Sequence, residues 1–445
     1  MTPAPARPPL STGVHQALAG LAAWLDTVRV PGGYGGPAVG VRTASLSYCG
    51  PAADWRLEGI LDGWGALANG GGAGVSATAL ARLASDLATL APAMLRDGTL
   101  RNSAFECNPC EGGMPHEPAV MAAALRARRL LRRHGVAVPG ALDEAVARHV
   151  EERLLKYLWN KQLLTFNDWP QSRYECYSPP GVAAAIELLL EYGDMSGGWP
   201  RLDHYLEGAA ASLLAVQRIQ GPAAGGLPLS NRPGAGSSPF ATARCLPALA
   251  ALHARTGDPA LKAAATAAAA FVRGQALSGG GFSFLAHERR PATRFPVMAG
   301  AVAGTLVALE RAGMLDDHDL AAHLPWLLAR RQPTGAFATA VGFSGTEDST
   351  PPDWRDILPV TGWLDKIFAL LALMAGRTRT EKDTRGKAEE AASTAAATFV
   401  CAVRLGWGRC GRYVEDAGGL RIEDRRGRCL FHWRKGDDWA GHNEL

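Results

Sequence analysis

The stretch Pro118-Ala-Val-Met-Ala recurs in outline at Pro180-Gly-Val-Ala-Ala, Pro239-Phe-Ala-Thr-Ala, Pro296-Val-Met-Ala-Gly and Pro359-Val-Thr-Gly. Each copy follows a polar loop that contains glycine, and successive prolines lie 62, 59, 57 and 63 residues apart. That interval fits one helical hairpin with its loops, and proline is favoured in the first turn of a helix. A less regular sixth copy begins at Pro51. Six such units predict a closed double ring of helices with a site at one rim.

A second set of helices is predicted between the proline-led ones. The proline-led helices consist largely of Ala, Val and Leu, whereas the intervening segments are amphipathic, with charges such as Asp143, Arg148 and Glu152 on one face. We therefore expect the charged set to form an outer ring and the apolar set an inner ring; an open solenoid or bundle is the alternative. The predicted outer helices span residues 14–28, 77–96, 142–158, 202–217, 259–273, 318–331 and 381–398.

The 445 residues divide into three predicted parts. A flexible segment is expected over 1–13, an all-α (α/α)6 toroid over 14–398, and a small C-terminal β-hairpin appendix over 399–445. In the last part the pattern changes to short alternating runs, and the turn Asp424-Arg-Arg-Gly427 links two predicted strands.

Composition narrows the function classes. The chain has 46 basic and 42 acidic side chains, and its arginines are scattered, so no nucleic-acid partner is expected. The N-terminus lacks the apolar run of a signal peptide, and no stretch is apolar for long enough to predict a transmembrane segment. We therefore expect a cytoplasmic protein whose eight cysteines are reduced thiols.

Two segments carry a family resemblance. Gln275-Ala-Leu-Ser-Gly-Gly-Gly-Phe282 and Gln332-Pro-Thr-Gly-Ala-Phe337 are similar to the Gln-x-x-x-Gly-x-aromatic repeats of the squalene cyclase, terpenoid cyclase and protein prenyltransferase superfamily. Its members are α/α toroids. The resemblance implies a biosynthetic enzyme that performs an acid-initiated cyclisation or rearrangement of an isoprenoid in the central cavity.

A third segment resembles that family's acidic motif, which protonates an alkene or epoxide. In Gly345-Thr-Glu-Asp-Ser-Thr350 the match implies Asp348 as general acid with Glu347 beside it, although threonine stands in place of the motif's first aspartate. Asp353 or Asp356 would be the electrostatic partner of Asp348. The alternative is that Glu347 and Asp348 are solvated loop acids.

A zinc site is a further possibility. Cys107-Asn-Pro-Cys110, followed by His116 and then Cys176, could supply the thiolate and imidazole ligands of a tetrahedral ion. Unliganded thiols or a local disulfide are the alternative reading of the same residues.

The loops before the inner helices also hold residues suited to a sugar. The group His116, Arg173, Tyr174 and Tyr177, together with Asn167, resembles a polysaccharide lyase site, in which a cation or amide neutralises a uronate and a tyrosine takes the proton. Tryptophans that could stack on sugar rings are Trp55, Trp169 and Trp354. Two alternatives to the isoprenoid enzyme therefore stay open: a carbohydrate-active lyase, hydrolase or epimerase acting on an oligosaccharide, and a non-catalytic toroid that binds a peptide or protein.

Overall fold

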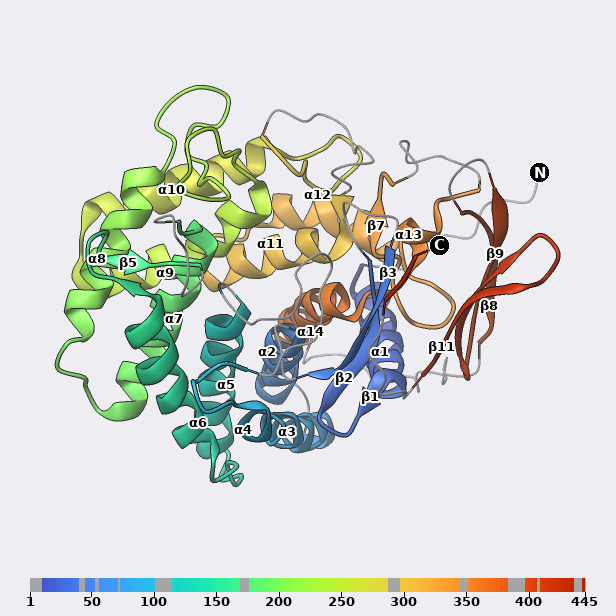
Figure 1. Cartoon of the computed structure of the whole chain (residues 1–445), viewed down its shortest axis with the longest axis horizontal. Coiled ribbons are helices and arrows are strands. Elements are labelled where there is room, and N and C mark those ends of the chain that lie inside the picture. Colours follow the sequence, from blue (N-terminus) through green and yellow to red (C-terminus); the bar gives the residue numbers. More distant parts are fainter. Residues whose placement is uncertain are drawn as a thin grey trace.

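An inner ring of helices follows from the repeated prolines, each of which lies in the first turn of one helix or a few residues before it. The computed structural model describes residues 10–39, 45–52, 56–70, 73–100, 114, 116–168, 176–286, 297–343, 351–382, 397–405, 409–435 and 442–444. Within these residues each inner helix contacts the next in chain order, and the last contacts the first, so the ring closes (Figure 1). The inner helices are α2 (Arg56–Gly70), α5 (His116–Arg133), α7 (Pro179–Ser196), α9 (Pro239–Thr256), α11 (Ala299–Arg311) and α14 (Thr361–Lys382).

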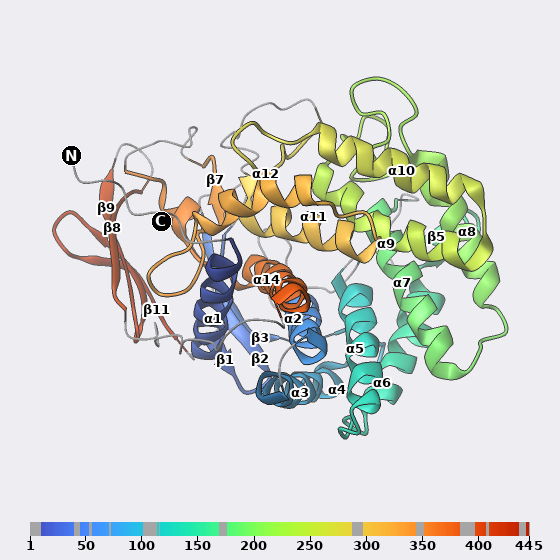
Figure 2. The same ribbon diagram turned by 180° about the vertical axis from the view of Figure 1, so that it is seen from behind.

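The helices predicted between the proline-led ones lie around the outside, as Figure 2 shows from behind. The expected difference in charge is not found, because the inner helix α5 carries five arginines whereas the outer helix α1 carries a single charged residue, Asp26. Five of the outer helices each pack against one inner helix: α3 against α2, α8 against α7, α10 against α9, α12 against α11, and α1 against α14. The outer elements are α1 (Leu10–Val28), α3 (Ala73–Leu87), α4 (Leu90–Ala93), α6 (Leu142–Arg148), the π-helix η1 (His149–Leu158), α8 (Leu202–Val216), α10 (Pro259–Gly274) and α12 (Asp317–Leu328). The outer helix expected at 381–398 falls mostly outside the described residues, and α14 runs to Lys382.

Two four-stranded antiparallel sheets accompany the helices. The first joins β1 (Arg29–Val30), β2 (Gly33–Val39), β3 (Ser45–Ala52) and β12 (His442–Glu444), and the second has the order β11-β10-β9-β8. The second sheet comprises β8 (Phe399–Arg404), β9 (Cys410–Asp416), β10 (Gly419–Asp424) and β11 (Cys429–Arg434). Shorter elements are β4 (Trp159–Asn160), β5 (Thr165–Phe166), β6 (Val297–Met298), β7 (Ala340–Val341) and α13 (Trp354–Ile357).

The coarse prediction of a mostly helical chain with a small antiparallel β region is confirmed. The expected turn after Asp424 does connect β10 to β11, with Leu420 opposite Trp433. The β region is larger than one hairpin. The sequence did not predict the sheet formed by β1, β2, β3 and β12. The glycines of Gly33-Tyr-Gly-Gly-Pro37 hide the alternation of polar and apolar residues that is typical of a strand. No helix in the described part of the chain is long and apolar enough to cross a membrane.

The C-terminal sheet is joined to the helical body by a buried polar contact. Figure 1 shows this sheet beside α1, at one side of the molecule. Trp24 of α1 donates its indole N–H to Glu415 of β9 over 2.7 Å, and the Tyr413 hydroxyl donates to the same carboxylate over 3.0 Å. Lys435 lies 3.1 Å from Glu415 and balances its charge. The sheet is therefore packed onto the ring through a fully paired carboxylate.

Close packing of the inner ring depends on glycine where α2 crosses α14. A methyl group at Gly59 would collide with the backbone carbonyl of Asp365, and one at Gly63 would lie 2.5 Å from the Phe368 ring. The two helices contact each other along their length. Small residues at this crossing thus let charged groups on α2 and α14 approach each other.

We expect Gly59→Ala to lower the free energy of unfolding by about 1–3 kcal/mol, because overpacking a tight contact forces the backbone apart. Chemical denaturation measures the change. The matched control is Gly74→Ala in α3, where the added methyl would meet no atom within 4 Å. The control should leave stability unchanged or slightly increased, since alanine favours a helix. Equal effects of the two substitutions would contradict the packing argument.

Candidate functional site

The interior of the ring is charged. All six inner helices contribute at least one ionisable side chain to two layers of ion pairs. The residues are Glu58 and Asp62 from α2, Arg126 from α5, Glu187 from α7, Arg244 from α9, Arg311 from α11, and Asp365 and Lys366 from α14.

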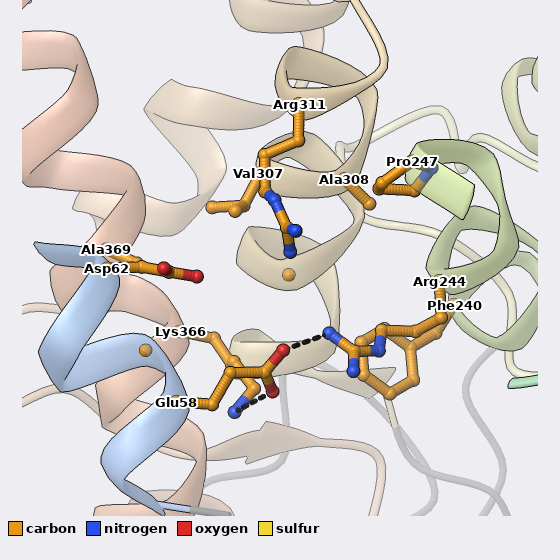
Figure 3. A pocket seen from close by; sticks show the side chains of 12 residues that line it. Glu58, Asp62, Phe240, Arg244, Pro247, Val307, Ala308, Arg311, Lys366 and Ala369 are labelled. Carbon is orange, nitrogen blue, oxygen red and sulfur yellow. Dashed lines mark hydrogen bonds and ion pairs between the residues drawn. The ribbon is translucent and has the colours of Figure 1, made fainter. Parts of the chain in front are cut away.

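The first layer lies near the start of α2, α9 and α14. Arg244 donates to one oxygen of Glu58 over 2.5 Å, and Lys366 lies 3.3 Å from the other oxygen (Figure 3). Lys366 also donates to Asp365 over 2.6 Å, and the backbone N–H of Gly59 donates to the same oxygen of Asp365 over 3.1 Å. The layer thus holds two carboxyl groups and two cations in a buried setting.

The second layer lies further along the ring axis. Arg126 donates to both oxygens of Asp62 over 2.9 Å and lies 3.7 Å from Glu187. Glu187 also accepts a hydrogen bond from Arg311. Because these residues come from α2, α5, α7 and α11, their pairing ties together helices on different sides of the ring.

A small cavity separates the layers. It is lined by Glu58, Asp62, Arg244, Arg311 and Lys366, together with apolar side chains of α9, α11 and α14 (Figure 3). Its free volume is about 20 Å³, which is room for one or two water molecules. A molecule of sugar or isoprenoid size does not fit in this cavity.

The two carboxyl groups of the first layer differ in proton affinity. Burial raises the pKa of Asp365 to about 7, against the lowering effect of Lys366. Burial acts in the same direction on Glu58, but the charges of Arg244 and Lys366 outweigh it and hold the pKa of Glu58 well below its usual range. Near pH 7 the layer therefore contains an ionised carboxylate beside a carboxyl that exchanges its proton, the combination used in acid–base catalysis.

Aromatic and polar side chains lie at the end of the ring where the inner helices begin. The rings of Phe240 and Trp363 meet edge to face with centroids 5.7 Å apart, and Phe240 is half-buried one turn before Arg244. His116, also half-buried, is the first residue of α5. This end of the ring therefore combines apolar surface with groups able to bind a polar molecule.

Asp168 adds a carboxylate near the start of α7. It accepts hydrogen bonds from the backbone N–H and the hydroxyl of Ser178, over 2.9 and 2.7 Å. Burial raises the pKa of Asp168 despite these bonds.

Most of the predicted site residues lie outside the described part of the chain. For these the roles inferred from sequence stay predictions. They are Trp55, Cys107, Cys110, Trp169, Arg173, Tyr174, Glu347 and Asp348.

Three predicted residues have structural partners on α13 or around it. Asp353 caps the helix by accepting the backbone N–H of Arg355 over 3.0 Å, and it pairs with the Arg355 guanidinium. Asp356 accepts the backbone N–H of Phe343 over 3.1 Å. Trp354 is 1% exposed, so the expected stacking of its ring on a sugar is corrected: this indole is part of the core.

Tyr177 is a buried residue beside α8. The Tyr177 hydroxyl is buried and donates to the Ser212 carbonyl over 3.2 Å, so it supports α8 in this structure. Cys176 is a half-buried free thiol. Among the described residues, no group of three or more His, Cys, Asp or Glu side chains is arranged to hold a metal ion. Zinc bound by Cys107, Cys110, His116 and Cys176 stays a prediction.

The charged interior was missed by sequence reasoning, although a signal exists. Single charged residues interrupt apolar helices five to eight positions after a repeated proline. The residues with this spacing are Glu58, Arg126, Glu187, Arg244 and Lys366. The repeat that starts at Pro296 lacks such a residue, and its first charges are Glu310 and Arg311. A charge that recurs at a similar place in five of six repeats indicates a polar interior once the repeats close into a ring.

No protein-family model and no curated protein matches the sequence. Solved structures do match the fold. An unsaturated glucuronyl hydrolase specific for heparin aligns with a TM-score of 0.58 at 13% identity, over 85% of this chain and 99% of its own. An unsaturated glucuronyl hydrolase from Streptococcus agalactiae gives 0.55 at 10% identity, over 82% of this chain and 93% of its own.

A third match is D-mannose isomerase, with a TM-score of 0.53 at 11% identity, over 84% of this chain and 100% of its own. These proteins are α/α toroid enzymes, in agreement with the fold predicted from the proline repeat. At such low identity the likeness extends to the fold alone.

Proposed function

We propose that the protein is a carbohydrate-active enzyme whose substrate binds at the end of the ring where the inner helices begin. The observation that carries the proposal is the interior of the ring, which is charged and has about 20 Å³ of free space between its two ion-pair layers. The solved structures with a similar fold that support it are named as glucuronyl hydrolases and a mannose isomerase.

The interior argues against the isoprenoid reaction. A cyclase that works in a central cavity needs an apolar space as large as its substrate and aromatic faces toward the developing cation. Here Glu58, Asp62, Arg244, Arg311 and Lys366 surround the space instead. Groups of this kind suit hydroxyl and carboxylate groups, which form hydrogen bonds with them.

The proposed site has a charged floor and a polar rim. Hydrolysis and isomerisation of a sugar both require proton transfer, which Glu58 as the ionised group and Asp365 as the proton-exchanging group would support, with Arg244 holding Glu58 in place. Phe240 and Trp363 would face an apolar side of the sugar ring. The predicted substrate contacts of the rim are His116, Trp55, Trp169, Arg173 and Tyr174, and Asp348 stays a candidate acid there.

The proposal is tested by turnover of defined substrates. Two kinds of sugar are tested as substrates: unsaturated uronides, whose cleavage removes an ultraviolet absorbance, and aldohexoses, whose isomerisation yields a ketose. A linear polyprenyl diphosphate and its epoxide are tested as isoprenoid substrates. Turnover of a sugar supports the proposal. Cyclisation of the isoprenoid, with all sugars unchanged, would overturn it.

His116→Ala is expected to lower kcat/KM for the sugar at least tenfold, with the main effect on KM, because a half-buried imidazole at the mouth of the site binds substrate. Steady-state kinetics measures the change, and thermal unfolding reports whether the fold is intact. The control is His134→Ala, an exposed histidine beyond the other end of α5. Unchanged kinetics for His116→Ala would remove this residue from the site.

A further inference from the structure

The cavity between the two ion-pair layers has a wall that is rich in hydrogen-bond donors. Among the described residues, Arg244 makes one hydrogen bond, to Glu58, and Arg311 makes one, to Glu187. A guanidinium group carries five N–H donors in a fixed fork. Most donors of these two arginines are therefore not used by the described part of the chain. Figure 3 shows both guanidinium groups directed into the space between the helices.

The carboxylates that line the cavity are already engaged. One oxygen of Glu58 accepts a hydrogen bond from Arg244, and Lys366 lies 3.3 Å from the other oxygen. Both oxygens of Asp62 accept hydrogen bonds from Arg126. The cavity thus presents many donors beside carboxylate oxygens that have partners. Such a wall favours a ligand that accepts hydrogen bonds and carries a negative charge.

The charges around the cavity favour the same kind of ligand. The residues that line it include three cations and two carboxylates, namely Arg244, Arg311 and Lys366 against Glu58 and Asp62. Over both layers, four cations face four carboxyl groups. Burial raises the pKa of one of these carboxyl groups, Asp365, to about 7. Near neutral pH the layers therefore carry a partial excess of positive charge, which is costly in a buried setting unless an anion balances it.

The size of the cavity limits the anion to a single atom. The free volume of about 20 Å³ holds a particle about as large as one water molecule, and an oxyanion such as phosphate needs more room. A water molecule would need acceptors for its own hydrogens, and the carboxylates of the wall already have partners. The side chains of Arg244 and Arg311 are not fully buried, so an ion from solvent can reach them.

We propose that this cavity binds one chloride ion between the guanidinium groups of Arg244 and Arg311. The ion accepts N–H groups from both arginines and so links the first ion-pair layer to the second. It also balances the positive charge that the carboxylates of the wall leave over. The proposal goes beyond the proposed enzymatic function and does not depend on it, because the ion is held by groups of this chain without a substrate.

Thermal unfolding in sodium chloride and in sodium gluconate, at equal ionic strength, tests the proposal. Gluconate has the same charge as chloride but is too large for the cavity, so the two salts differ in binding and not in screening. Raising chloride from about 10 mM to about 300 mM should raise the Tm of the unmodified protein by about 2 °C or more relative to gluconate, because a ligand that binds only the folded state stabilises it. Bromide should act like chloride.

Filling the cavity should abolish this difference between the salts. Ala308 lines the cavity on α11, and Ala308→Val adds two methyl groups there while every charged side chain is kept. The Tm of this variant should be the same in chloride and in gluconate. The control is Ala263→Val, which makes the same change at an exposed position of α10 and should keep the chloride effect of the unmodified protein.

Equal Tm values of the unmodified protein in the two salts would overturn the proposal, and so would a chloride effect that persists in Ala308→Val. If that variant does not fold, crystals of the unmodified protein soaked in sodium bromide decide the matter. Anomalous density for bromide between Arg244 and Arg311 supports the proposal, and bromide found only elsewhere contradicts it. Neither readout involves turnover, so failure of the chloride site and failure of the carbohydrate assignment are separate results.

Discussion

Replacing Glu58 by leucine should lower the free energy of unfolding by about 3–5 kcal/mol. The Glu58 side chain is 7% exposed and pairs with Arg244 and Lys366, whose side chains are 13% and 8% exposed. Removing the carboxylate leaves both cations in a poorly solvated interior with one partner fewer. Breaking a buried pair in this way costs far more than the pair itself contributes, because the remaining charge is uncompensated.

Urea denaturation of purified variants measures this loss. The control is Glu144→Leu, which removes a carboxylate that is 74% exposed and pairs with Arg148 one turn away. Exposed pairs of this kind contribute about 0.5 kcal/mol or less. Adding Arg244→Met to Glu58→Leu should recover part of the loss, because it removes one of the two uncompensated charges. A loss below about 1 kcal/mol for Glu58→Leu would mean that water reaches the first layer freely.

The ring could be predicted because its signals are local and repeated. A proline in the first turn and a run of small apolar residues specify one helix each, and the recurrence near 60 residues fixes their number. The alternation of proline-led and intervening segments also assigns inner and outer positions. These features do not depend on which helices contact each other, so they can be predicted from the sequence alone.

The charged interior could not be predicted in the same way. Arg244 is 186 positions from Glu58, and Arg311 is 124 positions from Glu187. Such partners meet only when the ring has closed, and a single arginine in an alanine-rich helix shows no partner beforehand. Clusters of polar residues in loops are visible in the sequence, so the residues predicted from it lie mainly in loops.

Asp353 and Trp354 illustrate a second limit. An aspartate followed by a short helical run is a typical N-cap, since its carboxylate accepts a backbone N–H of the first turn. The structure uses Asp353 in this way, and Trp354 turns into the core. The composition of a loop thus indicates which side chains could bind a substrate, while capping and packing decide which of them remain available.

Replacing Lys366 by methionine should cost about 3–5 kcal/mol of stability at pH 8 and clearly less at pH 5. The ammonium group lies 2.6 Å from Asp365 and 3.3 Å from Glu58, so the substitution removes a cation from two buried carboxyl groups. The pKa values of Asp365 and Glu58 then rise in the folded protein. Glu58 still pairs with Arg244 and stays ionised at both pH values. Asp365 binds a proton at pH 5 and becomes neutral, whereas its ionised form at pH 8 has lost its cation in the interior, so the folded state loses stability as pH rises.

Urea midpoints of the Lys366→Met variant and the unmodified protein at the two pH values give the difference directly. The pKa of Asp365 is already about 7 with Lys366 present, so the unmodified protein also loses stability from this group between about pH 4 and pH 7. The Lys366→Met variant should lose more stability than the unmodified protein, and this loss should extend to higher pH. Lys156→Met, at an exposed pair with Glu152, should leave stability almost unchanged at both pH values, because solvent screens such a pair. An equal loss at pH 5 and pH 8 for Lys366→Met would show that this lysine contributes packing and that its charge does not stabilise the buried carboxylates.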